Sequence, residues 1–206
     1  MENKCFKNKT ETAVRDSVAG WLYQHPNLRQ LPSSPNCVVN PSSEGVPIIS
    51  GGGSGHEPSH LGYVAQGMLT ASVAGEPFAS PGVEDIKDTV LTVCDDDKGG
   101  GCLMIVKSYT GDRLNFTRAK DICEATFKKK VEIVFVADDC AVGLDKGITG
   151  RRGVVSTESP ESVEAHSASL SRRIQRVILS HPFFRRRQGP SSCTSAAARL
   201  RSREAA

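Results

Sequence analysis

Apolar residues recur along the chain with two spacings, and their alternation predicts the fold class. Apolar positions three or four residues apart, typical of amphipathic helices, occur in residues 11–23, 58–68, 82–94 and 112–127. Short apolar runs typical of buried strands occur at residues 46–49, 71–74, 103–106 and 131–136, with at most a short strand at 37–39. Because strands and helices alternate, we predict an α/β fold with a largely parallel sheet and flanking helices.

Ligands of such sheets bind beyond the carboxyl ends of the strands, which here selects the loops at residues 50–58, 107–113 and 137–142. The first loop has four glycines in the five positions from Gly51 to Gly55, followed by His56. Glycines let the backbone turn and approach a ligand, and histidine exchanges protons near neutral pH. The loop matches neither a Walker nor a dinucleotide pattern. It suits phosphates or other small oxygen-rich ligands, and the structural alternative is a tight turn with a surface histidine.

The second loop places Lys107 where a strand is predicted to end and Asp112 where a helix is predicted to begin. A lysine can polarise a substrate oxygen, and a carboxylate can accept a hydroxyl proton. Alternatively, Asp112 is an N-cap and Lys107 a solvated end residue. In the third loop, Asp138 and Asp139 are adjacent, so their carboxylates point in different directions. They indicate a turn, and we predict no metal site.

Charge divides the chain into two parts. The 206 residues contain 26 Lys plus Arg and 23 Asp plus Glu, but residues 1–150 have a net charge of −4 and residues 151–206 a net of +7. We therefore predict a domain over residues 10–155 and an Arg/Ser-rich segment over 156–206. Three origins stay open for that segment: an out-of-frame or intron-derived end, a natural disordered segment that contacts nucleic acid or anionic surfaces, or a partner-binding helix at residues 171–179.

Composition also excludes several classes of protein. No apolar stretch reaches the ~18–20 residues that a membrane span needs, and residues 1–10 do not resemble a secretory signal. The seven cysteines are scattered without a C-x-x-C pair, which argues against a disulfide framework and a zinc site. We expect a cytoplasmic protein without a membrane partner.

Four groups of residues carry a resemblance to a known family. The strings SGGGSGHEP, GMLTASVAGEPFASP, MIVKSYTGDRLNF, and ADDCAV with GRRGV occur in this order. Together they closely resemble the substrate-binding (DhaK) domain of dihydroxyacetone (glycerone) kinases over about residues 10–154. The resemblance implies ATP-dependent phosphorylation of a primary hydroxyl of dihydroxyacetone or glyceraldehyde.

The resemblance also implies roles for individual residues. The substrate would be held by Gly53, Ser54, Gly55 and His56, with His56 also in acid/base work. Lys107 and Asp112 would bind substrate oxygens, and Asp112 would be the base on the attacking hydroxyl. This division suits phosphoryl transfer, in which catalysis is mainly positioning and charge stabilisation.

The family's machinery extends beyond what this chain displays. The family's substrate domain continues past GRRGV to a histidine that holds the ketone as a hemiaminal, and neither His166 nor His181 has that histidine's glycine-rich surroundings. ATP and magnesium belong to a separate helical domain, in the same chain or on a partner. We therefore expect a partial domain that is inactive alone, and a homodimer is left open.

The competing hypotheses are a non-catalytic sugar-binding remnant and a nucleic-acid-binding protein that uses the Arg-rich segment. Flavin nucleotide cyclisation by the parent enzyme, as in some animal members, also stays open.

Overall fold

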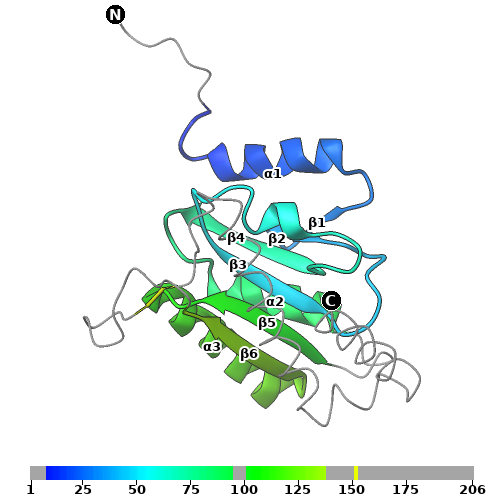
Figure 1. The fold of residues 1–206 in the computed structure, drawn as a ribbon, viewed down its shortest axis with the longest axis vertical. Helices are drawn as coiled ribbons and strands as arrows, with labels where there is room; N and C mark the ends of the chain where they lie inside the picture. Colours follow the sequence, from blue (N-terminus) through cyan, green and yellow to red (C-terminus); the bar gives the residue numbers. More distant parts are fainter. Residues whose placement is uncertain (1–7, 95–100, 138–150, 153–206) are drawn as a thin grey trace, which may run out of the picture. The chain divides into compact units, whose positions relative to one another are not determined.

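The computed structural model describes residues 8–94, 101–137, 151 and 152, all within the first of the chain's two units, residues 1–154 (Figure 1). Its sheet has the strand order β1-β2-β4-β3-β5-β6. The strands are β1 (Arg29–Leu31), β2 (Ser34–Val39), β3 (Ile48–Ser54), β4 (Ala71–Pro77), β5 (Gly101–Lys107) and β6 (Lys130–Val136). β4, β3, β5 and β6 run parallel, and β2 is antiparallel to both of its neighbours. The prediction of a largely parallel α/β fold is confirmed.

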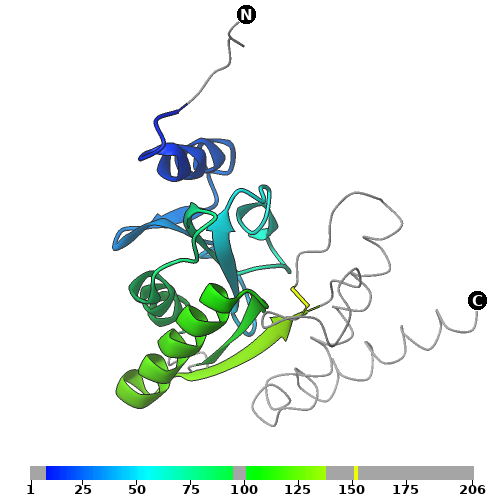
Figure 2. The ribbon, with the colours of Figure 1, turned by 90° about the vertical axis from the view of Figure 1, so that its left-hand side faces the viewer.

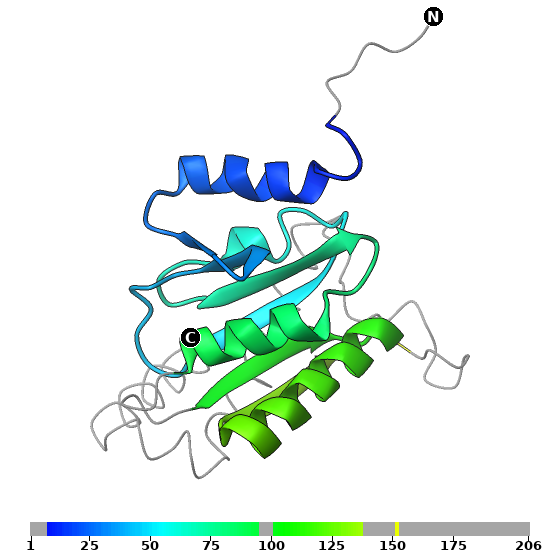
Figure 3. The same cartoon turned by 180° about the vertical axis from the view of Figure 1, so that it is seen from behind.

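In the part of the chain that the structure describes, three α-helices pack against this sheet. They are α1 (Ala13–Gln24), α2 (Val83–Val93) and α3 (Thr110–Phe127). Figures 2 and 3 show α2 and α3 side by side over one face, whereas α1 lies apart from them and contacts β2 and β4. The helices predicted at 11–23, 82–94 and 112–127 are therefore confirmed.

The core has two parts because side chains alternate along a strand. On β2, Cys37 and Val39 belong to the larger cluster with α2 and α3, whereas Val38 belongs to the smaller cluster with Val18 of α1. The large cluster contains Ile49, Ala71, Val73, Ile86, Val90, Met104, Val106, Phe116 and Ala119, among others. Both faces of β2 are thus buried, β3 contributes Ile49 near its amino-terminal end, and β5 contributes Cys102, Met104 and Val106 along its length.

The sequence predicted a loop over residues 50–58, but the first part of this glycine segment is strand. Strand β3 continues to Ser54, and Gly51 and Gly52 pair with β4. A Cβ atom on Gly51 would lie 2.3 Å from the carbonyl oxygen of Val73 and 3.1 Å from the ring of Phe116. Glycine is therefore required here by close packing. The turn comes later, at Gly55, whose φ of +119° favours glycine.

The helix predicted over residues 58–68 is wrong. The segment contains only the short 3-10 helix η1 (Leu61–Tyr63), and Val64 then forms an isolated bridge with Leu69. Gly62 lowers helix propensity, and Gly67 has a φ of +75°, which no α-helix accommodates. The apolar spacing instead serves the smaller core cluster, to which Val64 and Leu69 belong.

Other differences concern lengths and coverage. The three-residue β1 was not predicted, β2 begins three residues before the predicted strand, and β4 extends three residues past it. The predictions for Asp138 and Asp139, for residues 156–206 and for His166 and His181 lie outside the described residues. Within the described ranges, no helix combines the length and apolar character that crossing a bilayer requires.

Candidate functional site

Two predicted site residues meet over the glycine strand, at the carboxyl ends of β3 and β5. Lys107 is the last residue of β5, and Asp112 lies in the first turn of α3. Their exposed fractions are only 6% and 2%. A Cβ atom on Gly52 would lie 2.6 Å from Nζ of Lys107 and 3.3 Å from Oδ2 of Asp112. The missing side chain of Gly52 therefore leaves the space that these two charged groups occupy.

This placement rules out the structural alternatives that the sequence left open for Asp112 and Lys107. The N-cap of α3 is Tyr109, so Asp112 is not the capping residue. Lys107 is buried, so it is not a solvated end residue. Its ammonium lies 5.5 Å from the centre of the Tyr109 ring, and the guanidinium of Arg152 lies 5.2 Å from the same centre. The site therefore adjoins Arg152, which belongs to the GRRGV string that was singled out only by the family resemblance.

Burial shifts both charged groups toward their neutral forms. It raises the pKa of Asp112, against the opposing effects of a hydrogen bond from Ser80 and of the nearby Lys107 and His56. It lowers the pKa of Lys107, against the charges of Asp112 and Glu57. Oδ1 of Asp112 is buried and has no hydrogen-bond partner in the described part of the chain. A buried carboxylate with a free acceptor atom suits proton abstraction from a bound hydroxyl.

His56 follows the glycine strand and reaches the same region. Both carboxylate oxygens of Glu57 accept from the backbone N–H of Gly55, at 3.1 and 3.0 Å, and so fix the turn. The His56 ring is half-buried and meets the Phe78 ring edge-on, with 6.2 Å between the centroids. Its Nδ1 is buried and finds no acceptor or donor among the described residues. A purely surface histidine is thus not what the structure contains.

Gly53 and Ser54 connect β3 to the chain that follows β4. A Cβ atom on Gly53 would lie 2.9 Å from both the backbone N and O of Ala79, so glycine is needed for this approach. The hydroxyl of Ser54 donates a hydrogen bond of 2.7 Å to the carbonyl of Gly75. Its proton is therefore engaged by β4, and Ser54 contributes to holding the edge of the site in place.

Sequence reasoning missed His60 and Ser50. The hydroxyl of Ser50 lies 2.9 Å from Nδ1 of His60 and donates a 2.7 Å hydrogen bond to the carbonyl of Ile105. Burial, with smaller effects of Lys107 and His56, lowers the pKa of His60 to about 3. No sequence motif includes both residues, and the helix predicted over residues 58–68 did not predict a contact between His60 and β3.

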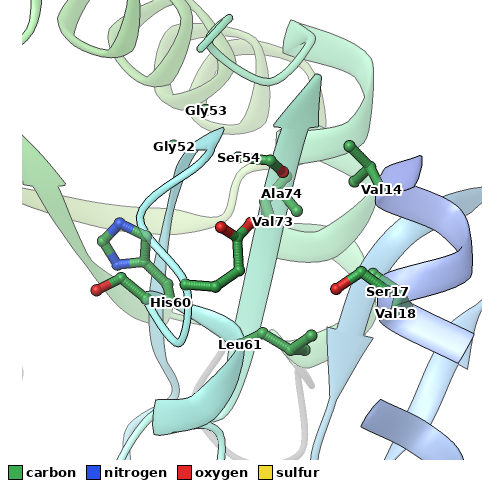
Figure 4. A pocket seen from close by; sticks show the side chains of 12 residues that line it. Val14, Ser17, Val18, Gly52, Gly53, Ser54, His60, Leu61, Val73 and Ala74 are labelled. Atoms are coloured by element: carbon green, nitrogen blue, oxygen red, sulfur yellow. The ribbon is translucent and has the colours of Figure 1, made fainter. Parts of the chain in front are cut away.

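A cavity lies beside this cluster, between α1 and the carboxyl ends of β3 and β4 (Figure 4). It is lined by Val14, Ser17, Val18, Gly52, Gly53, Ser54, Glu57, Ser59, His60, Leu61, Val73 and Ala74. Lys107 and Asp112 do not line it, although Gly52 borders both the cavity and these two side chains. Glu57 and His60 are the titratable side chains that line the cavity, and the buried Lys107 and Asp112 pair lies next to it across Gly52. Gly52 and His60 connect the two regions.

The residues of the site do not form a metal centre. Across residues 8–94, 101–137, 151 and 152, no three histidine, cysteine, aspartate or glutamate side chains are grouped so that they could hold a metal ion. We therefore derive no step through a magnesium ion or a nucleotide bound to these residues.

Comparison with known proteins shows which family the chain resembles. Residues 19–180 match the family model described as the Dak1 domain, so the match runs past the boundary expected at residue 155. The dihydroxyacetone-binding subunit DhaK of PTS-dependent dihydroxyacetone kinase 1 from Listeria innocua is 41% identical over 156 residues, or 75% of this chain and 46% of that protein. The triokinase/FMN cyclase of Rattus norvegicus is 40% identical over 160 residues, which cover 76% of this chain and 27% of that protein.

Solved structures give the same result. The crystal structure of the dihydroxyacetone kinase of C. freundii has a TM-score of 0.66 and 39% identity, covering 73% of this chain and 28% of that one. Its crystal structure in complex with AMP-PNP and Mg2+ gives a TM-score of 0.65. The chain therefore spans less than half the length of the relatives described here.

Proposed function

The chain belongs to the dihydroxyacetone kinase family through its Dak1 domain, and from this membership we propose that it binds dihydroxyacetone and presents one hydroxyl for phosphorylation. The observation that carries the proposal is the buried pair of Lys107 and Asp112 over Gly52. Such a pair offers a hydrogen-bond donor and an acceptor to a small polar molecule. A short ketose has a carbonyl and hydroxyl groups that match both.

In the proposed reaction, Asp112 is the base. Its Oδ1 accepts a hydrogen bond from the primary hydroxyl of the substrate, and Nζ of Lys107 donates to a substrate oxygen. As the hydroxyl oxygen forms its bond to phosphorus, the bond from phosphorus to the donor's leaving oxygen breaks and the hydroxyl proton passes to Asp112. The raised pKa of Asp112 helps, because a more basic carboxylate accepts a proton more readily.

The glycine strand and His56 complete the proposed substrate site. The backbone of Gly53 and Gly55 lies where a small ligand can approach it closely, and Ser54 holds this edge against β4. His56, with its unpartnered Nδ1, is proposed to exchange a proton with a substrate oxygen. Glyceraldehyde is the second proposed substrate, since it also has a primary hydroxyl near a carbonyl.

We further propose that ATP and magnesium, which supply the phosphoryl group, are held by a separate domain or partner. The crystal structure of the C. freundii enzyme in complex with AMP-PNP and Mg2+ supports this division, because the present chain covers only 28% of that enzyme. The chain alone is then expected to bind sugar without turning it over. ATP, magnesium and dihydroxyacetone supplied together should give no phosphorylated product, and robust turnover would contradict the division.

Calorimetric titration of the full chain with dihydroxyacetone tests the binding function. Saturable binding should weaken by roughly 10–100-fold in Asp112→Asn, because a hydrogen bond to a charged group contributes about 1.5–3 kcal/mol. Asp121→Asn, at an exposed position on the same helix, is the matched control and should bind as the parent does. Absence of saturable binding to the unmodified chain would overturn the proposed function.

A further inference from the structure

Unpartnered buried polar atoms gather at one place in this molecule. Within the described residues, the buried side-chain atoms without a hydrogen-bond partner belong to Trp21, His56, His60 and Asp112. The last three are coupled electrostatically to each other or to Lys107. Buried polar atoms in folded proteins are almost always paired, so a group of orphans at a polar site points to a ligand that pairs with them. The proposed function uses Asp112 and His56 and leaves His60 without a role.

Hydrogen bonding around Ser50 determines which nitrogen of His60 carries the proton. The carbonyl of Ile105 can only accept, so the Ser50 hydroxyl proton is directed to it over 2.7 Å. The Ser50 oxygen, 2.9 Å from Nδ1 of His60, must then accept, and Nδ1 must carry a hydrogen. In a neutral ring, Nε2 is left with a bare lone pair. The strongly lowered pKa of His60 agrees with a ring that stays neutral.

We propose that His60 is a substrate-contacting residue whose Nε2 accepts a hydrogen bond from the second hydroxyl of dihydroxyacetone. Ser50 is the positioning residue that holds the required tautomer. This inference rests on the proposed function and deepens it. His60 lines the cavity that borders Gly52 and Gly53, and its ring lies near enough to Lys107 for the lysine charge to act on it.

The arrangement defines a substrate class. Asp112 and His60 both supply acceptors, and both are close enough to Lys107 for its charge to affect their pKa. Two acceptors beside one cationic donor match a carbonyl flanked by two hydroxyl groups. The site should therefore favour small ketones hydroxylated on both sides over those with one hydroxyl.

Two variants of His60 separate its two nitrogens. Asn at position 60 keeps an amide donor near the Ser50 oxygen and removes the acceptor at Nε2. Gln places an amide oxygen near the Nε2 position and so restores an acceptor. In the full chain, His60→Asn should bind dihydroxyacetone roughly 10-fold more weakly, and His60→Gln should recover to within about 3-fold of the parent. Unfolding midpoints identify any variant whose fold has been lost.

A second ligand supplies a readout that a structural role does not change. Hydroxyacetone lacks one hydroxyl, so the parent should bind it about 10-fold more weakly than dihydroxyacetone. In His60→Asn this preference should disappear, because the second hydroxyl then has no acceptor and each ligand presents one hydroxyl to Asp112. If His60→Asn keeps the preference and the affinity of the parent, the inference is wrong while the proposed function stands. If the parent binds neither ligand, both fall together.

The tautomer can be measured without any ligand. Two-bond 1H–15N correlation spectra of the full chain should show the His60 proton on Nδ1, and Ser50→Ala should shift the population toward Nε2–H. A parent spectrum with the proton on Nε2 would overturn the inference even if dihydroxyacetone binds.

Discussion

Strands β3 and β5 lie side by side, and their two halves differ sharply in chemistry although both are buried. In the amino-terminal halves, Ile49 pairs with Met104, and both side chains are fully buried in the large core cluster. In the carboxyl-terminal halves, β3 is Ser50 followed by glycines, and β5 ends in Lys107. The first half is filled by apolar side chains from both strands, whereas in the second half Val106 of β5 is the last core side chain, lies opposite Gly51, and is followed by Lys107.

The two halves have opposite effects on the free energy of unfolding. Burial of apolar area in the first half stabilises the fold. Burial of Lys107 and Asp112 in the second half costs free energy, because both lose hydration and Oδ1 of Asp112 finds no partner in the described structure. The fold tolerates this cost because apolar burial in the first half stabilises it by more, and functional sites commonly reduce stability in this way. Substitutions in the two halves should therefore fail in different ways.

The largest expected effect comes from the apolar half. Ile49→Ala should lower the free energy of unfolding by about 2–5 kcal/mol, because it leaves a cavity between β3 and the helices. Denaturant unfolding followed by circular dichroism measures the loss. Leu114→Ala, at a side chain 69% exposed on α3, is the matched control and should change the value by less than about 0.5 kcal/mol. A loss below about 1 kcal/mol for Ile49→Ala would remove the contrast between the two halves.

Substitutions at Gly51 and Gly52 test where the apolar half ends and the charged half begins. In Gly51→Ala the new methyl meets the backbone oxygen of Val73 at 2.3 Å, and a backbone cannot move aside cheaply. We expect about 1–3 kcal/mol of destabilisation. In Gly52→Ala the new methyl lies 2.6 Å from the end of the Lys107 side chain, and that side chain can rotate away.

Gly52→Ala should therefore unfold close to the parent but bind dihydroxyacetone more than about 10-fold more weakly, since Lys107 leaves its place. Chemical denaturation and calorimetry on the pair measure both quantities. Equal losses of stability in the two variants would show that the border does not lie between these glycines.

Sequence reasoning predicted the elements with strong periodicity and the two charged residues of the site. Helix α3 and strands β5 and β6 follow apolar patterns that local spacing defines, and Lys107 and Asp112 stand at their junction. The glycine strand was misread because glycines serve both turns and close approach, and only the position of β4 distinguishes them. His60 was missed because its contact with Ser50 depends on a chain reversal that replaces the predicted helix.

The smallest expected effect concerns how stability depends on pH. Burial raises the folded-state pKa of Asp112 above its ordinary value, so the folded chain retains this proton when the unfolded chain has released it. The contribution of Asp112 to stability is then fully present below the unfolded pKa and is lost as pH rises through the folded pKa. Asp112→Asn cannot titrate and should lack this loss.

The free energy of unfolding of Asp112→Asn, taken relative to the parent, should therefore increase between pH 4 and pH 7. Asp112→Asn also removes the charged partner of Lys107, which changes the free energy of unfolding by a constant amount. That constant does not alter the slope with pH, because the remaining groups titrate in both proteins. Denaturant unfolding of parent and variant across this range measures the slope, with Asp121→Asn expected to show none. A difference that falls as pH rises would mean that Lys107 stabilises the Asp112 carboxylate more than burial destabilises it. The carboxyl half of the sheet would then hold a favourable ion pair, and the contrast with the apolar half would lose its energetic basis.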